Sequence, residues 1–272
     1  MAHRTLEKKV VLITGASSGI GYELAKQLFS QGAFLFLLAR REDKLKQLAE
    51  ELDPSGQRIS SLAGDVTQPQ DLVTAVEHCL RSFGKLDIAI ANAGFGVAGN
   101  VSDLSIEDYR RQLETNVFGV LNTVYAAEKA LESTQGQLVL IGSVAGFVPL
   151  PGNSAYTMSK FCIRALATAL RYEWKSRGIA VTHIAPGFVD SDIRRVDNQG
   201  LLKAGHPDPI PAWIRMSTPA AVKEILKAIR KRKAQQVITT HGKLILWINQ
   251  YWPQLIPWII GMAGLKAREE PK

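Results

Sequence analysis

The sequence predicts an α/β fold, a single Rossmann-like doubly wound parallel sheet with helices on both faces. Short apolar runs alternate along the chain with amphipathic stretches of ten or more residues, which is the pattern of βαβ units. The apolar runs show little polar–apolar alternation, as expected of parallel strands that are covered on both faces. A glycine-rich turn directly follows the first apolar run. These three observations together favour a doubly wound sheet.

Six strands and six helices are expected. The strands are Val10–Ile13, Phe34–Ala39, Ile59–Ala63, Ile88–Ala91, Gln137–Ile141 and Ile179–Ile184. The helices are Ile20–Ser30, Glu42–Leu52, Asp71–Phe83, Ile106–Leu131, Ala155–Arg177 and Ala220–Arg232. Residues 1–242 are expected to form one domain, with a lid at about 188–217 where glycines and prolines interrupt the periodicity. Residues 243–272 form an apolar carboxyl-terminal extension.

Composition narrows the function classes. The 272 residues are 46% hydrophobic and 21% charged, which is ordinary for a globular protein with a substantial core. Two distant cysteines, Cys79 and Cys162, and five scattered histidines predict neither a disulfide framework nor a metal site. The polar start of the chain predicts no signal peptide, and with the cysteines it favours a cytoplasmic protein.

The net charge of +8 is concentrated near the carboxyl terminus. Residues 1–222 hold 23 Lys and Arg against 22 Asp and Glu, a balance of +1. Residues 223–272 hold 10 against 3, a balance of +7. Nucleic-acid binding needs a basic face on the folded body, so the nearly neutral main body disfavours it.

The turn after the first strand reads Thr14-Gly15-Ala16-Ser17-Ser18-Gly19-Ile20-Gly21. Glycines permit a tight turn and a close backbone approach, and the following helix presents unpaired N–H groups to a pyrophosphate. Such a turn can also be a mere strand-to-helix connection. Its position after the first strand favours a dinucleotide site, and the missing Gly-Lys-Ser/Thr sequence disfavours ATP.

The end of the second strand distinguishes the two nicotinamide cofactors. A carboxylate there would bind a free ribose 2′-hydroxyl, whereas an arginine accommodates a 2′-phosphate. The chain has Ala39-Arg40-Arg41 at this place. Guanidinium groups bind phosphate with paired hydrogen bonds, although both arginines could equally be solvated. We predict NADP(H), with Arg40 as the main contact and Ser17 assisting.

Three Tyr-x-x-x-Lys pairs occur, each of which would place both side chains on one helical face: Tyr22/Lys26, Tyr125/Lys129 and Tyr156/Lys160. Context separates them. Tyr156 alone follows a strand ending in Ile141-Gly142-Ser143, at the edge where open α/β sheets bind ligands. The intervening loop contains glycines and prolines and is able to fold back. Ser143, Tyr156 and Lys160 are therefore the predicted catalytic group.

With these motifs in order, the chain resembles a short-chain dehydrogenase/reductase of the main 250-residue type over about residues 8–192. The matching motifs are Thr14–Gly21, Asp65-Val66, Asn92-Ala93-Gly94, Asn116, Ser143, Tyr156-x-x-x-Lys160 and Pro186-Gly187. One departure is Ser191, where the family often has threonine. This serine keeps a hydroxyl group for the nicotinamide amide.

The resemblance implies residue roles. Tyr156 would be the general acid/base, Lys160 would stabilise its phenolate and hold the nicotinamide ribose, and Ser143 would bind the substrate oxygen. Asn116 would fix a water that relays protons to Lys160, or would merely cap a helix kink. The implied cofactor contacts are Gly15, Ser17, Ser18, Gly19, Ile20, Gly21, Arg40, Asp65, Val66, Asn92, Ala93, Gly94, Tyr156, Lys160, Pro186, Gly187, Val189 and Ser191.

The residues expected to face the substrate are apolar. They are Phe95, Val97, Ala145, Phe147, Leu150, Phe188 and Trp213, beside Ser143, with Arg194 and Arg195 able to reach an anionic group. We therefore expect an NADP(H)-dependent oxidoreductase that interconverts a hydrophobic ketone or aldehyde and its alcohol, because a sugar would need several polar anchors. A homodimer or homotetramer is expected.

Two other functions stay open. A 3-oxoacyl-thioester reductase would need a basic patch near the entrance for its carrier, and Lys223–Lys233 could supply one. A non-catalytic NADP(H)-sensing protein is disfavoured by the intact Asn116, Ser143, Tyr156 and Lys160.

The tail is uncharged from Leu244 to Leu265 and holds Trp247, Trp252 and Trp258. Pro253 and Pro257 argue against a transmembrane helix. Contact of residues 243–265 with an anionic membrane surface, helped by the basic run upstream, is one expectation. Burial against a partner subunit, or over the substrate pocket, is the other.

Overall fold

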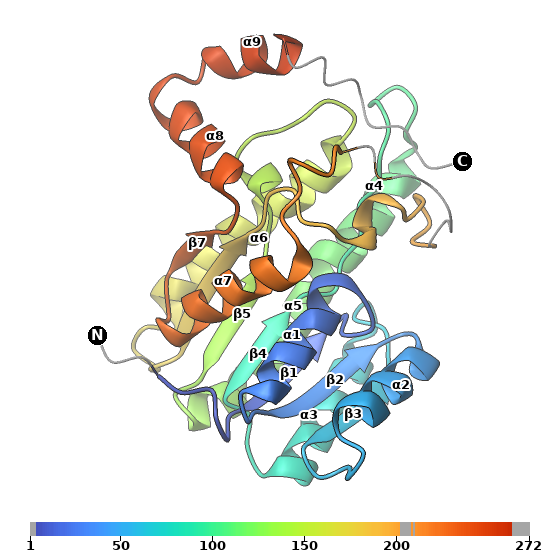
Figure 1. Ribbon diagram of the computed structural model, residues 1–272, viewed down its shortest axis with the longest axis vertical. Helices are drawn as coiled ribbons and strands as arrows, with labels where there is room; N and C mark the ends of the chain where they lie inside the picture. The colour runs from blue at the N-terminus through green and yellow to red at the C-terminus, as the bar shows by residue number, and fades with distance from the viewer. Residues whose placement is uncertain (1–3, 202–207, 209, 263–272) are drawn as a thin grey trace.

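In the computed structural model, which describes residues 4–201, 208 and 210–262, the apolar runs pair into one parallel sheet (Figure 1). Its order is β3-β2-β1-β4-β5-β6-β7. The strands are β1 (Val10–Thr14), β2 (Phe34–Ala39), β3 (Ile59–Ala63), β4 (Ile88–Ala91), β5 (Gln137–Ile141), β6 (Ala180–Ala185) and β7 (Gln235–Val237). The predicted fold class is confirmed.

Helices cover both faces of the sheet (Figure 1). They are α1 (Gly19–Ser30), α2 (Glu42–Leu52), α3 (Pro69–Phe83), α4 (Ile106–Leu113), η1 (Glu114–Phe118), α5 (Gly119–Ser133), η2 (Val144–Gly146), α6 (Ser154–Glu173), η3 (Asp192–Arg194), α7 (Thr218–Arg230), α8 (Thr240–Tyr251) and α9 (Leu255–Met262).

The sheet separates two hydrophobic cores. Alternate residues of a strand point to opposite faces, so Val11 and Ile13 of β1 pack with α1, α2 and α7, whereas Val10 and Leu12 pack with α3, α5 and α6. All five residues of β1 are buried. This double burial explains why its sequence lacks polar–apolar alternation.

Two differences from the sequence prediction lie at the edge of the sheet and in the fourth predicted helix, and α8 and α9 add helices that were not predicted. A seventh strand, β7, joins the edge of the sheet, and its short sequence Gln-Gln-Val carries no apolar run that would reveal it. The predicted helix Ile106–Leu131 is divided by the π-helical turn η1 into α4 and α5. Hydrophobic periodicity continues through the turn, so the break leaves little trace in the sequence.

Strand order reverses between β1 and β4, because the chain builds outward to β3 before returning to pair with β1. In open α/β sheets ligands bind outside the carboxyl ends of strands at such a reversal. The fold therefore indicates that the loops after β1 and β4 form part of a ligand-binding site.

The tail forms α8 and α9 at one end of the molecule (Figure 1). The predicted domain boundary after residue 242 falls inside α8. None of the helices in the described ranges is both long and apolar enough to cross a membrane.

Candidate active site

A cavity of about 2060 Å³ opens at the carboxyl edge of the sheet. It collects loops that follow β1 to β6, which are distant in sequence. The sequence-predicted residues that line it are Gly15, Ser17, Ser18, Gly19, Ile20, Arg40, Asp65, Val66, Asn92, Ala93, Gly94, Phe95, Ser143, Ala145, Leu150, Tyr156, Lys160, Pro186, Gly187, Phe188, Val189, Ser191 and Arg194. The structure thus brings most of the predicted nucleotide and catalytic residues into one pocket, whereas Gly21 and Asn116 are not among its lining residues.

Hydrogen bonds between β1 and β4 shape the glycine-rich turn. The hydroxyl of Thr14 accepts the N–H groups of Asn92 (3.0 Å) and Ala93 (3.1 Å), and the Asn92 amide donates to the carbonyls of Thr14 (2.9 Å) and Gly15 (3.2 Å). Gly15 has a φ of +66°, and a Cβ there would lie 2.8 Å from the Cα of Ala93. Only glycine fits this position without a shift of the backbone.

Gly21 was also expected near the cofactor, and it has a packing role. A Cβ on Gly21 would lie 2.2 Å from the Gly15 carbonyl oxygen. The missing side chain lets α1 approach the turn, so Gly21 acts through the shape of the loop.

The two arginines after β2 lie in different surroundings at the pocket rim. Arg41 donates to the Ser17 hydroxyl from Nε (3.2 Å) and Nη2 (2.9 Å), and also to the Ser17 carbonyl. Arg40 approaches the far side of the pocket, where a Cβ on Gly200 would lie 3.7 Å from its Nη2. The sequence prediction named Arg40 and Ser17 as contacts of the 2′-phosphate, and the structure adds Arg41, which is bound to Ser17.

The three Tyr-x-x-x-Lys pairs lie in different surroundings. Tyr22 and Lys26 both bind the Glu51 carboxylate, at 2.7 and 2.9 Å, and the hydrogen bond to Glu51 raises the pKa of Tyr22. Tyr125 is 69% exposed on α5. Tyr156 lines the pocket with Lys160, whose Nζ lies 5.5 Å from the Tyr156 ring centroid. The contextual choice made from the sequence thus agrees with the geometry.

Lys160 is buried at the foot of the pocket. Its Nζ donates to the carbonyl of Ile141 at 3.0 Å, and burial lowers its pKa to about 8. Ser143 follows β5 directly, and its hydroxyl accepts the N–H of Ala145 at 3.1 Å. Both side chains therefore reach the pocket from β5 and α6, which meet at its floor.

Asn116 lies in the π-helical turn and is 1% exposed. Its side chain accepts the N–H of Phe95 (3.1 Å) and donates to the Phe95 carbonyl (2.9 Å) and to Ser159 Oγ (3.2 Å). Single π turns inside α-helices occur frequently at functional sites. The described contacts of the amide are with the loop after β4 and with α6.

Some residues expected at the substrate site lie elsewhere. Phe147 packs on Arg164, whose Cζ lies 4.0 Å from the ring centroid, and Trp213 is 85% exposed. Val97 is fully buried. Arg194 lines the pocket, but its guanidinium is buried in an ion pair with Asp208 (2.5 Å), so its charge is already neutralised.

The tail supplies pocket residues that sequence reasoning did not name. They are His241, Leu244, Ile245, Ile248 and Ile259. His241 accepts the N–H of Phe188 on Nε2 (3.0 Å) and stacks on its ring, which fixes the start of α8 against the loop after β6. The long uncharged run from Leu244 is the sequence feature that indicated this contact. Burial of the tail over the substrate pocket was among the alternatives expected for it.

Comparison with known proteins agrees with this arrangement. The family model described as short chain dehydrogenase matches residues 9–201. The chain belongs to the short-chain dehydrogenase/reductase family. A mouse relative, dehydrogenase/reductase SDR family member 7B, is 32% identical over 97% of this chain and 84% of its own length.

Solved structures share the fold of this short-chain dehydrogenase. An alcohol dehydrogenase from Thermococcus sibiricus, complexed with 5-hydroxy-NADP, has a TM-score of 0.73 and 27% identity over 86% of this chain and 97% of its own. A short-chain dehydrogenase/reductase from Burkholderia phymatum, in complex with NAD, has a TM-score of 0.81 and 20% identity over 99% of each chain.

Beneath the active site of this short-chain dehydrogenase lies a second buried titratable group, His183. A Cβ on Gly142 would lie 2.1 Å from its Nε2, which explains the glycine before Ser143. Within the described ranges no hydrogen bond of ordinary geometry reaches either ring nitrogen of His183, and burial lowers its pKa from 6.5 to about 4, with Gln235 opposing part of the shift. A charged imidazolium is therefore unfavourable in the folded state.

We expect His183 to make the fold acid-sensitive. Because the pKa is lower in the folded state, protons favour the unfolded chain as the pH falls from about 6.5 toward 4. Between pH 7 and pH 5 the unmodified protein should lose about 2 kcal/mol more unfolding free energy than His183→Leu. Urea unfolding of both proteins at each pH measures the difference, and an equal loss in both would contradict the assignment.

Proposed function

We propose that the protein is an NADP(H)-dependent oxidoreductase that interconverts a hydrophobic ketone or aldehyde and its alcohol. The observation that carries the proposal is the presence of Ser143, Tyr156 and Lys160 in one pocket with the glycine-rich turn. Ser143, the Tyr156/Lys160 pair and the glycine-rich turn come from three separate motifs, and their convergence fits proton transfer beside a bound dinucleotide.

Proton transfer is assigned to Tyr156. A phenol has an ordinary pKa of about 10, so its anion must be stabilised for exchange near neutrality. The nearby ammonium of Lys160 favours the phenolate by charge attraction. Ser143 donates to the substrate oxygen and holds it toward Tyr156. The hydride is supplied by the nicotinamide when it is bound.

The pocket residues fit a dinucleotide. The glycine-rich turn has no side chain at Gly15 or Gly19, and Ser18, the N-cap of α1, makes no side-chain capping bond. The N–H groups at this helix start are therefore open to a pyrophosphate. Arg40 and Arg41 line the same pocket with no carboxylate on the end of β2, which favours a 2′-phosphate.

Apolar lining supports a hydrophobic substrate. Seven apolar side chains line the pocket, four from the tail and three from the loops of the sheet. They are Leu244, Ile245, Ile248 and Ile259, and Phe95, Leu150 and Phe188. The acyl-carrier alternative is less well supported, because Arg230 and Arg232 contact Gln31 and Gln135 at the edge of the sheet opposite the pocket. Exposed Tyr125, Met158 and Phe161 on α5 and α6 suit the expected homo-oligomer.

The three Tyr/Lys pairs give an internally controlled test of the general acid. Tyr156→Phe removes only the phenolic proton donor and should lower kcat by about 100-fold or more while NADPH still binds. Tyr125→Phe, on the exposed face of α5, is the matched control and should keep most of the activity. Retention of more than about a tenth of kcat by Tyr156→Phe would rule out the assignment.

Cofactor preference tests the nucleotide part of the proposal. In a panel of apolar ketones and aldehydes, kcat/KM with NADPH should exceed that with NADH by about 10- to 1000-fold, as expected of one or two charge-assisted contacts. Arg40→Asp should shift the preference toward NADH, and Arg41→Ala should weaken NADPH use without favouring NADH. Equal use of both cofactors by the unmodified protein would be inconsistent with NADP(H) specificity.

We also propose that the tail makes peripheral contact with a membrane surface. Its inner face lines the pocket, whereas Trp247 (51% exposed), Tyr251, Trp252 and Trp258 face outward. Trp and Tyr are favoured at the headgroup level of bilayers. Of the basic run upstream, Arg230 and Arg232 lie at the other edge of the sheet and do not reinforce this contact, which leaves the exposed Lys243 of α8 to attract an anionic surface.

Co-sedimentation with vesicles distinguishes the contribution of the exposed aromatic residues from that of charge attraction. The protein should pellet with phosphatidylcholine vesicles, adding phosphatidylserine should help little, and physiological salt should weaken binding by less than about twofold. Trp247→Ser with Trp258→Ser should abolish pelleting, and Tyr172→Ser, at a still more exposed aromatic residue on α6, should not. Full-length protein that stays in the supernatant at low and physiological salt would exclude membrane contact.

A further inference from the structure

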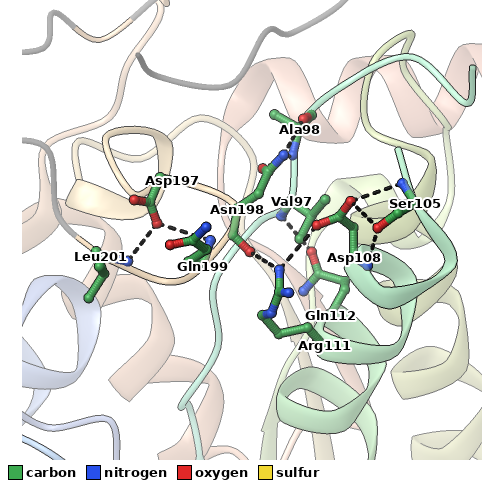
Figure 2. A network of polar contacts seen from close by, with 10 residues as sticks. All are labelled: Val97, Ala98, Ser105, Asp108, Arg111, Gln112, Asp197, Asn198, Gln199 and Leu201. Carbon is green, nitrogen blue, oxygen red and sulfur yellow. Dashed lines mark hydrogen bonds and ion pairs between the residues drawn. The ribbon is translucent and has the colours of Figure 1, made fainter. Parts of the chain in front are cut away.

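The segment Asp197–Leu201, in the loop between β6 and α7, forms a tight turn at the pocket rim (Figure 2). The Asp197 carboxylate accepts the N–H groups of Gln199 (3.0 Å) and Leu201 (2.8 Å). The N–H of Asp197 donates to the carbonyl of Leu201 at 2.9 Å, and Gly200 has a φ of +85°. These local bonds give the turn a defined shape, and Gln199, Gly200 and Leu201 line the pocket.

Asn198 fastens this turn to the loop after β4. Its side chain accepts the N–H of Ala98 (2.8 Å) and donates to the Ala98 carbonyl (2.9 Å) (Figure 2). The side-chain amide of Asn198 therefore binds both backbone polar groups of Ala98. Its own carbonyl accepts from Arg111 of α4 at 2.9 Å, and Arg111 also pairs with Asp108. Asn198 and Ala98 are both buried, so these bonds are shielded from water.

The loop after β4, which binds Asn198, is itself held by side chains of α4 and of the π-helical turn η1. Gln112 of α4 accepts the N–H of Val97 (2.7 Å) and donates to the Phe95 carbonyl (2.9 Å). Asn116, four residues along, binds both backbone groups of Phe95. Asn198 is therefore attached to a loop whose position is fixed by the same helix that carries Asn116.

The tip of the turn reaches the opposite rim of the pocket. Gly200 lies beside Arg40 at the end of β2, close enough that a Cβ there would be in van der Waals contact with the guanidinium. The segment Asp197–Leu201 thus lies between the loop after β4 and the arginine assigned to the adenosine end of the cofactor.

We propose that Asn198 is a positioning residue that latches the segment Asp197–Leu201 over the dinucleotide and so controls the passage of NADP(H) in and out of the pocket. The proposal rests on the NADP(H) binding proposed above. Asn198 positions the loop through Ala98 and Arg111 and takes no part in proton or hydride transfer.

The latch has a kinetic consequence. A dinucleotide held beneath the turn leaves only when the turn opens, so its dissociation rate scales with the fraction of time the turn is open. Removing the Asn198 amide leaves the buried N–H and carbonyl of Ala98 without these partners, which favours opening. The latch bonds join protein atoms only and make no contact with the cofactor. Opening of the turn therefore speeds both entry of NADP(H) into the pocket and its release.

Stopped-flow fluorescence of bound NADPH, chased with excess NADP⁺, measures the effect. Asn198→Ala should speed NADPH dissociation by about tenfold and should also speed association, while the single-turnover rate with a small apolar ketone changes less than twofold. Arg111→Gln, at a partly exposed residue that holds the Asn198 carbonyl, should shift both rates in the same direction by less. Asn100→Ala, which removes only an exposed bond to Asp103 in the neighbouring loop, should match the unmodified protein.

Three outcomes overturn the latch. If Asn198→Ala and Arg111→Gln both release NADPH at the normal rate, the turn does not gate the pocket, and the proposed function stands. If Asn198→Ala weakens NADPH binding through slower association and a lower unfolding temperature, its role is structural. If the unmodified protein fails to bind NADPH, the proposed function falls together with the latch.

Discussion

The active site depends on a connection between two strands that are far apart in sequence. At the reversal of strand order, Asn92 joins the ends of β1 and β4 by donating its backbone N–H to the Thr14 hydroxyl and its side-chain amide to the Thr14 carbonyl. The bonds hold the glycine-rich turn open beside Ala93, where a Cβ on Gly15 would clash. Every other pocket loop is arranged around this junction, since the sheet orders them by strand.

Burial of basic groups is the second constraint. Burial removes Lys160 from water and lowers its pKa, and its Nζ donates to the carbonyl of Ile141, whereas His183 is buried against Gly142. Such groups destabilise a fold unless their surroundings compensate. Both lie close to the proposed site of proton transfer, where a lysine of pKa about 8 is still mostly charged near neutrality and can attract the Tyr156 phenolate, whereas the neutral imidazole adds no charge.

Local sequence patterns predicted most of the fold and most of the residues that gather in the pocket, whereas they could not predict contacts between distant segments. Tyr156 was distinguished from Tyr125 because a strand and a serine precede it, and that order is visible in the sequence. The pairing of Ser17 with Arg41 depends on side-chain direction, and the π turn around Asn116 leaves the periodicity unchanged. The pocket contact of Ile245 depends on where the tail folds back, which no local pattern specifies.

The junction of β1 and β4 also orders the events of folding. Its hydrogen bonds close a loop of 78 residues, whereas β1 and β2 are joined by a single helix and turn. The entropy lost on closure grows with loop length, and parallel pairings between distant segments form slowly. Loop-closure entropy therefore favours formation of the half-sheet of β1, β2 and β3 before β4 docks. A dinucleotide, which needs loops from both halves, binds only the completed sheet and protects it against unfolding without speeding its assembly.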